Sequence, residues 1–250
     1  MDGVLWRDNT PIGNLSDIFA RIRELGLKVA LATNNATKTV DEYLEKLSGF
    51  GVRLEPWQII TSALATTDRL AKQFPNRGPV FVIGGNGIQR ALEECGFTPI
   101  IDPDDETTPV AVVGGIDRFV TYGKLRRATL LIRGGVPFYG TNPDKTFPTP
   151  QGLVPGAGAI LAAIEAATDV KPVILGKPEP AMMYMALERL GVTPEETLVV
   201  GDRLETDIVA GQAAGCKTAL VLSGVTTRQQ AEAWQPAPDF IAYDLSTLHE

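Results

Sequence analysis

Side chains that can bind a phosphoryl group or a metal ion stand at the start of this 250-residue sequence and at the ends of several apolar runs. They are Asp2, Thr33, Asn34, Asn35, Lys177, Asp202 and Asp207. Hydroxyl, amide and ammonium groups can hold phosphoryl oxygens, whereas carboxylates are ligands for Mg²⁺. The residue types therefore indicate phosphoryl chemistry supported by a hard cation.

The elements that must position these residues follow an α/β pattern, in which apolar β-branched runs alternate with amphipathic segments. Strands are predicted at 27–33, 79–85, 110–115, 172–177, 197–202, 217–222 and 240–243. Helices are predicted at 14–25, 39–47, 62–73, 87–97, 121–135, 157–167, 180–190 and 205–214. Ligands of open parallel sheets bind at the carboxyl ends of the strands, so the polar residues at those ends are expected on one rim.

A second series of alternating strands and helices begins after a turn-forming segment that contains Pro75, Asn76 and Gly78. We therefore predict a Rossmann-like parallel-sheet core formed by residues 1–76 and 172–250. An α/β cap domain formed by residues 77–171 is predicted to be inserted into it.

Charge and hydropathy exclude two other classes of function. The net charge is −7, whereas nucleic-acid binding depends on clustered Lys and Arg. The tightest basic group, formed by Lys124, Arg126 and Arg127, is interpreted as one solvated helix face. No apolar run reaches the roughly 18 residues of a membrane span. We therefore expect neither a nucleic-acid nor a membrane partner.

The few histidine and cysteine residues limit the catalytic mechanisms that are open to this protein. The lone histidine, His249, is the penultimate residue and is expected in a disordered tail, which argues against mechanisms that need a catalytic or zinc-binding histidine. Cys95 and Cys216 are interpreted as inert thiols in a reducing compartment, the cytoplasm. Any chemistry must therefore use carboxylates, hydroxyls, lysine and a hard metal.

Four motifs occur in order: Asp2-Gly3-Val4-Leu5, LATNNATKT, LGKPEPAM and VVGDRLETDI. Together they resemble the motifs of the haloacid dehalogenase superfamily, and more closely its NagD-like (p-nitrophenylphosphatase-like) subclass. In that subclass the cap lies between the second and third motifs, where the predicted insertion stands. The segments GIDRFVTYGKL, FYGTNPDKTFP and AGCKTALVLSGVTT also resemble it, so the similarity covers essentially the whole chain.

The resemblance implies Mg²⁺-dependent hydrolysis of small phosphomonoesters through an aspartyl-phosphate intermediate. It implies that Asp2 is the acid and base, with its main-chain carbonyl on Mg²⁺. Thr33 and Lys177 would bind the phosphoryl oxygens, with Asn34 and Asn35 beside them. Two further acids belong to the predicted metal site: Asp202 would bind the metal and Asp207 would support it. The expected partner is a small phosphorylated metabolite, and a homodimer formed through the cap would fit the subclass.

The resemblance is incomplete at the start of the chain. The family motif reads D-x-D-G, and its first Asp, the nucleophile, would lie two positions before Asp2, upstream of Met1. We interpret this as a misplaced start codon or a cropped fragment, because the strand that leads into the motif lies centrally in the sheet. Its loss would remove several buried side chains worth roughly 1.5–3 kcal/mol each. The alternative is a non-catalytic protein of the same fold that binds phosphate ligands.

Each residue also has a structural interpretation. The TNN sequence can form a turn, Lys177 can be a solvated loop lysine, and the two late acids can serve the start of the following helix. Asn142 and Asp144 in the cap can touch the leaving group or form Asx turns. Trp6 can line the site entrance or pack against the first helix. The run IGGNGIQ lacks the third glycine of a dinucleotide fingerprint, which favours a tight strand-to-helix turn over a nucleotide-cofactor oxidoreductase.

Overall fold

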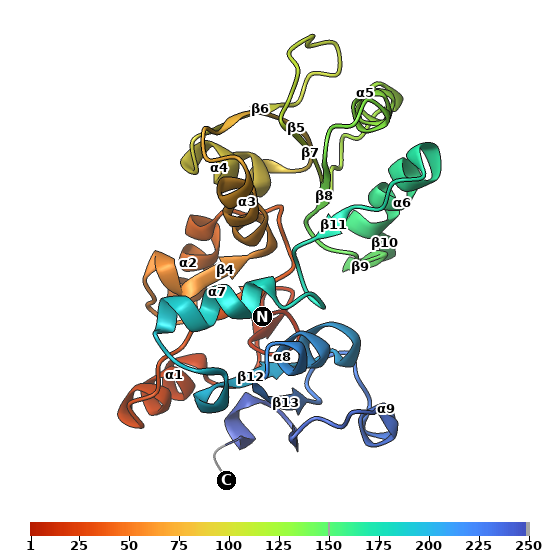
Figure 1. Cartoon of the computed structure of the whole chain (residues 1–250). Coiled ribbons are helices and arrows are strands. Elements are labelled where there is room, and N and C mark those ends of the chain that lie inside the picture. Colours follow the sequence, from red (N-terminus) through yellow and green to blue (C-terminus); the bar gives the residue numbers. More distant parts are fainter. Residues whose placement is uncertain (150, 249–250) are drawn as a thin grey trace. The chain divides into compact units, whose positions relative to one another are not determined.

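The computed structural model describes residues 1–149 and 151–248, and His249 therefore lies outside the described residues (Figure 1). The chain divides into two compact units. The first comprises Met1–Thr33, Val40–Ile60 and Lys177–Glu250, and the second comprises Asn34–Thr39 and Thr61–Gly176. The assignment of a core and a cap domain with the bounds given above stays a prediction.

The first unit is built around a three-stranded parallel sheet in the order β12 (Leu198–Gly201), β13 (Lys217–Val221) and β14 (Phe240–Ala242). A second pair of strands is β3 (Leu31–Thr33) and β4 (Ile59–Thr61), and an antiparallel hairpin is formed by β1 (Trp6–Arg7) and β2 (Thr10–Pro11). Gly201 pairs with Leu220, so the carboxyl ends of β12 and β13 lie at one edge. Residues that follow these two strands are thereby brought together.

The helices of the first unit are α1 (Leu15–Glu24), α2 (Val40–Gly49), α7 (Ala181–Leu190), α8 (Val209–Ala213) and α9 (Arg228–Ala233). A π-helical turn, Leu204–Ile208, precedes α8, and short 3-10 turns occur at Pro56–Gln58, Pro194–Glu196 and Leu245–Thr247. The N-terminal segment packs into the same core as α1 and α2, where Trp6 is 1% exposed and clusters with Leu15 and Phe19. The packing interpretation of Trp6 is therefore confirmed.

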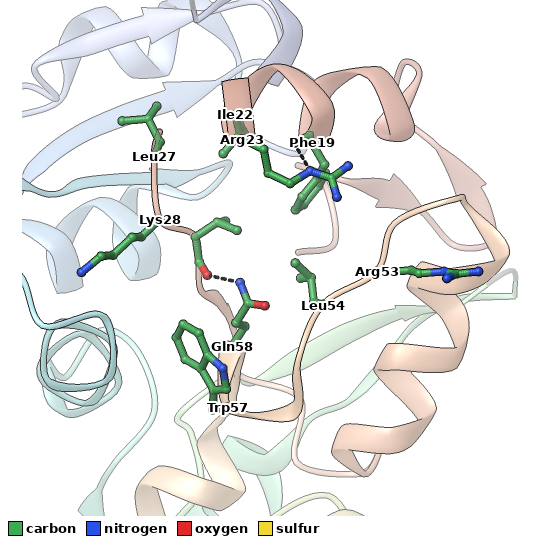
Figure 2. A pocket seen from close by; sticks show the side chains of 10 residues that line it. Phe19, Ile22, Arg23, Leu27, Lys28, Arg53, Leu54, Trp57 and Gln58 are labelled. Atoms are coloured by element: carbon green, nitrogen blue, oxygen red, sulfur yellow. Dashed lines mark hydrogen bonds between the residues drawn. The ribbon is translucent and has the colours of Figure 1, made fainter. Parts of the chain in front are cut away.

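A hollow of about 220 Å³ opens in the first unit between α1 and the 3-10 turn Pro56–Gln58. Apolar and aromatic side chains form most of its wall, among them Phe19, Ile22 and Trp57. Figure 2 shows the charged ends of Lys28 and Arg53 directed outward on opposite sides. The hollow lies beside the segment that enters β3, whereas Thr33 ends that strand, and none of the predicted site residues lines it.

The second unit contains a five-stranded parallel sheet. Its strands, in spatial order, are β11 (Val173–Ile174), β8 (Phe138–Gly140), β7 (Ala111–Gly114), β5 (Gly78–Ile83) and β6 (Phe97–Ile100). Its helices are α3 (Ser62–Gln73), α4 (Asn86–Glu94), α5 (Tyr122–Arg133) and α6 (Ala157–Thr168). An antiparallel hairpin joins β9 (Thr146–Thr149) to β10 (Gly152–Pro155). Four consecutive residues of β5, Val80 to Ile83, are fully buried, as in a parallel sheet covered on both faces.

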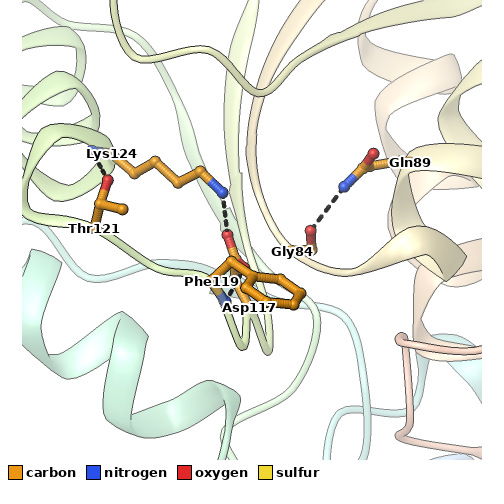
Figure 3. Close-up of polar contacts among 6 residues, drawn as sticks. All are labelled: Gly84, Gln89, Asp117, Phe119, Thr121 and Lys124. Carbon is orange, nitrogen blue, oxygen red and sulfur yellow. Dashed lines mark hydrogen bonds and ion pairs between the residues drawn. The ribbon is translucent and has the colours of Figure 1, made fainter.

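Two loops of the second unit are closed by side chains (Figure 3). Gln89 donates to the carbonyl of Gly84 at 2.9 Å and closes the turn between β5 and α4, which confirms the strand-to-helix turn predicted for IGGNGIQ. Lys124 donates to the buried carboxylate of Asp117 at 2.7 Å, and its side chain is 17% exposed. The prediction of one solvated basic face on α5 is therefore wrong at Lys124, because this lysine neutralises a buried acid.

The predicted α/β parallel-sheet fold is confirmed, with local corrections. The helix predicted at 87–97 ends at Glu94, because Gly96 takes a left-handed φ of 85° and Phe97 begins β6. The strand predicted at 27–33 is limited to β3. The stretch 138–156 contains three strands that its Pro and Gly content concealed. Among the described residues, none of the helices is both long and apolar enough to cross a bilayer.

Candidate active site

A buried ion pair forms the centre of the predicted site in the first unit. Lys177, in the turn between β11 and α7, lies with its Nζ 2.6 Å from Oδ1 of Asp207, and the two side chains are 9% and 10% exposed. The solvated-loop interpretation of Lys177 is therefore wrong. A buried ammonium is costly without a partner, and the carboxylate of Asp207 supplies one.

Asp207 is held on both carboxylate oxygens. Its Oδ2 accepts the main-chain N–H groups of Asp202 and Arg203, at 3.1 and 3.2 Å. Burial by itself would raise the pKa of Asp207. The ammonium of Lys177, the N-terminal ammonium and the hydrogen bonds from Lys177 and Arg203 outweigh it and lower the pKa below its ordinary value. The side chain is therefore an ionised carboxylate that fixes both Lys177 and the loop after β12. This position agrees with a supporting role, and its contribution to a metal site stays a prediction.

Asp202 follows β12 directly and is 5% exposed. Its Oδ2 accepts the N–H of Val225 at 3.2 Å, and its carbonyl accepts the hydroxyl of Thr226 at 2.6 Å. Burial and the nearby charge of Asp207 raise the pKa of Asp202. A buried carboxylate whose charge is penalised in this way is stabilised by a cation.

Two glycines let the main chain approach this carboxylate. A Cβ added at Gly3 would lie 2.4 Å from Oδ2 of Asp202, and one added at Gly224 would lie 2.0 Å from the same atom. Gly3 also has a left-handed φ of 75°. The main chain at Gly3 and Gly224 therefore lies close around the Asp202 carboxylate, and carboxylate and carbonyl oxygens are ligands that suit a hard cation such as Mg²⁺. Within residues 1–149 and 151–248, however, no three His, Cys, Asp or Glu side chains are grouped closely enough to hold a metal by themselves.

The loop after β13 connects the N-terminal turn to Asp202. Ser223 donates its hydroxyl to the carbonyl of Gly3 at 2.7 Å, while Val225 and Thr226 hold Asp202 as described. None of these three residues is among the predicted site residues. They could have been found by the rule that located Lys177 and Asp202, because they follow the carboxyl end of a predicted parallel strand.

Asp2 is exposed, and its Oδ1 accepts the indole N–H of Trp6 at 2.8 Å. Thr33 ends β3 and is 5% exposed. The first unit therefore contains five of the predicted site residues, namely Asp2, Thr33, Lys177, Asp202 and Asp207.

The remaining predicted residues, Asn34, Asn35, Asn142 and Asp144, lie in the second unit. Asn34 donates to Oδ2 of Asp144 at 3.2 Å, and its carbonyl accepts the side-chain amide of Asn142 at 2.7 Å. Asn142 also accepts the N–H of Asp144, and Asn35 accepts the N–H of Thr37, so both form Asx turns. A role of these four residues in substrate binding stays a prediction.

Comparison with known proteins identifies the family. A haloacid dehalogenase-like hydrolase model matches residues 1–98, and a second, HAD-hydrolase-like model matches residues 174–248. The acid sugar phosphatase of Staphylococcus aureus is 37% identical over 246 residues, which cover 98% of this chain and 93% of that protein. The chain belongs to the haloacid dehalogenase-like hydrolases.

Solved structures place the chain within this superfamily. NagD from Escherichia coli K-12 superposes with a TM-score of 0.88 at 32% identity, covering 98% of this chain and 94% of NagD. A glycerol phosphate phosphatase from Mycobacterium tuberculosis, solved with magnesium, superposes with a TM-score of 0.92 at 33% identity, covering 100% of this chain and 75% of that one. The predicted NagD-like subclass is therefore confirmed, and this haloacid dehalogenase-like protein is a phosphoric monoester hydrolase.

Proposed function

We propose that this protein hydrolyses small phosphomonoesters in a Mg²⁺-dependent reaction through an aspartyl-phosphate intermediate. The observation that supports this best is the buried pair of Lys177 and Asp207 beside the buried carboxylate of Asp202. It combines a cation suited to phosphoryl oxygens with an acid suited to a metal ion. The names of its relatives, an acid sugar phosphatase and a glycerol phosphate phosphatase, agree with a small metabolite as substrate.

In the proposed reaction, Thr33 and Lys177 bind the phosphoryl oxygens, and the ion pair with Asp207 orients the ammonium. Asp202 and the main-chain carbonyl of Asp2 would hold Mg²⁺, which when bound neutralises phosphate charge. The nucleophile is the aspartate that the family motif places two positions before Asp2. Asp2 gives a proton to the leaving oxygen as the ester bond breaks, and it then takes a proton from the water that attacks the aspartyl-phosphate.

The experiment is p-nitrophenyl phosphate hydrolysis with and without Mg²⁺. Two proteins are compared: the 250-residue chain, and the same chain expressed with the genomic codons that precede Met1. We expect Mg²⁺-dependent turnover in the extended protein and none in the other. If both proteins fold and neither turns over the ester, the proposed reaction is wrong for this protein, and the non-catalytic phosphate-binding alternative is favoured.

A further inference from the structure

The carboxylate to which we assign acid–base chemistry is tied to a tryptophan through one of its two oxygens. The indole Nε1 of Trp6 donates to Oδ1 of Asp2 at 2.8 Å. Asp2 is exposed, whereas Trp6 is 1% exposed. An exposed side chain that would otherwise sample several rotamers is therefore anchored to the core.

The indole itself is held in place from several directions. Its ring packs against Phe50 with 5.9 Å between ring centroids, and the ammonium of Lys46 lies 4.4 Å from the ring centre. The main chain is fixed as well, because the carbonyl of Trp6 accepts the N–H of Gly3 at 2.8 Å. The position of the indole N–H is thereby set by packing and main-chain hydrogen bonds. It is a rigid reference for the Asp2 carboxylate.

An indole N–H can donate a hydrogen bond but cannot accept one. The oxygen that faces it, Oδ1 of Asp2, must therefore present a lone pair. The carbonyl oxygen of a carboxylic acid is a better acceptor than its hydroxyl oxygen, so this hydrogen bond favours the proton on Oδ2. We infer that Trp6 is a positioning residue that leaves Oδ2 of Asp2 as the oxygen that exchanges protons during catalysis. The inference rests on the proposed function, since it assumes that Asp2 is the acid and base of the reaction.

The protons balance over the two half-reactions. In the first, the bond from the nucleophilic oxygen to phosphorus forms, the bond to the leaving oxygen breaks, and the proton on Oδ2 moves to that leaving oxygen. In the second, water attacks the phosphorus of the aspartyl-phosphate and gives its proton to Oδ2. The bond from phosphorus to the nucleophilic oxygen breaks, inorganic phosphate leaves, and the nucleophilic carboxylate is restored. Oδ1 stays hydrogen-bonded to the indole in both.

This assignment predicts a dependence on the leaving group. An alkoxide, such as the one released from glycerol phosphate, needs a proton as it leaves, whereas p-nitrophenolate is stable without one. The parameter to compare is kcat/KM, because it reports only the steps up to transfer of the phosphoryl group. The later hydrolysis of the aspartyl-phosphate, which is common to all substrates, does not enter it.

The test uses Trp6→Phe in the protein expressed with its upstream codons, assayed with glycerol phosphate and with p-nitrophenyl phosphate. Phenylalanine keeps an aromatic ring but removes the donor. We expect kcat/KM for glycerol phosphate to fall by about tenfold or more, since general acid catalysis contributes roughly 10²–10⁴-fold, and for p-nitrophenyl phosphate by less than about threefold. Asp2→Asn removes the acid itself, so its loss of kcat/KM on glycerol phosphate relative to p-nitrophenyl phosphate is the largest selective loss expected.

The matched control is Phe50→Leu, which disturbs the packing of the same ring and leaves its N–H in place. It should change both substrates by the same factor. Equal losses on the two substrates in Trp6→Phe, or the same selective loss in Phe50→Leu, would overturn the inference.

The two proposals fail in distinguishable ways. If the unsubstituted protein turns over neither substrate, the proposed function is wrong. If it turns over both and Asp2→Asn selectively loses glycerol phosphate, the proposed function stands. A Trp6→Phe protein without that selectivity would then refute the role of Trp6 alone. Should Trp6→Phe not fold, Trp6→Met offers a second large apolar side chain that has no hydrogen-bond donor.

Discussion

The ammonium of Lys177 and the carboxylate of Asp207 form a buried ion pair, with 2.6 Å between Nζ and Oδ1. The remaining carboxylate oxygen accepts the N–H groups of Asp202 and Arg203, so one acid fixes a lysine and the loop after β12 together. Burying either charge without the other would cost free energy, because each group loses its hydration when it leaves water. The pair therefore determines both stability and the geometry of the site.

Replacing Asp207 with Asn should destabilise the protein by about 3–5 kcal/mol, because the buried ammonium of Lys177 loses the carboxylate that it contacts at 2.6 Å. The measurement is urea denaturation near neutral pH. The matched control is Glu94→Gln, which breaks the exposed pair with Arg90 on α4, where the two side chains are 58% and 56% exposed. We expect less than about 1 kcal/mol there, and equal losses at the two positions would contradict the assignment.

The same pair predicts a pH dependence of stability. The pKa of Asp207 is lowered below its ordinary value of 3.8, so its ionised form contributes stability that is present above 3.8 and is lost as the pH falls through the folded-state pKa. The difference in unfolding free energy between the unsubstituted protein and Asp207→Asn should be constant above about pH 5 and should shrink in acid. If this difference in unfolding free energy grows as the pH falls, the pKa of Asp207 is not lowered in the folded protein.

Replacing Asp202 with Asn should have opposite effects on stability and on activity. The pKa of Asp202 is raised by burial and by Asp207, so its negative charge is unfavourable in the metal-free folded state at neutral pH. We expect Asp202→Asn to unfold at a higher temperature than the unsubstituted protein in chelator. Its Mg²⁺-dependent turnover of p-nitrophenyl phosphate should fall by about 100-fold or more, because the loss of even an indirect partner of a metal typically costs 10–100-fold. Full activity would refute the metal assignment.

Replacing Lys177 with Ala should weaken phosphate binding and turnover together. Removing one preorganised donor to a developing negative charge typically costs about 10²–10³-fold in rate. Inhibition by inorganic phosphate measures binding independently of chemistry. Lys28→Ala is the control in the same unit, since Lys28 is exposed and donates to the carbonyl of Leu190. If Lys177→Ala leaves the turnover rate and the inhibition by inorganic phosphate unchanged, Lys177 has a structural role and does not bind phosphate.

Replacing Gly3 with Ala should move the carboxylate of Asp202, because the added Cβ would lie 2.4 Å from its Oδ2. Gly191→Ala is matched in backbone conformation, with φ of 62° against 75°, and its Cβ would meet nothing within 4 Å. We expect about 1–2 kcal/mol of destabilisation at Gly191 and a larger loss at Gly3, where the clash adds to the strain. Turnover should fall about 100-fold only in Gly3→Ala, because displacements near 1 Å can cost that much.

The helices could be predicted from the periodicity of their apolar residues, whereas several short strands could not be predicted from the sequence. The helix predicted at 62–73 coincides with α3, which Thr61 caps through its hydroxyl. The strand β4, by contrast, has three residues and lies directly before that helix, so it offers too few residues for an alternating pattern. The hairpin of β9 and β10 was missed because its Pro and Gly content resembles a loop.

Local pattern and residue type were enough to predict the α/β class, to recognise the family motifs and to locate the acids and the lysine near strand ends. These depend on local pattern and on residue type, which a linear sequence contains in full. Three contacts could be seen only in the folded protein. Lys177 is buried against Asp207, Ser223 and Thr226 hold the loops of Gly3 and Asp202, and Trp6 holds Asp2 by one oxygen. Burial and hydrogen-bond partners arise between segments up to 220 positions apart, and their energies depend on distance in space and on the exclusion of water.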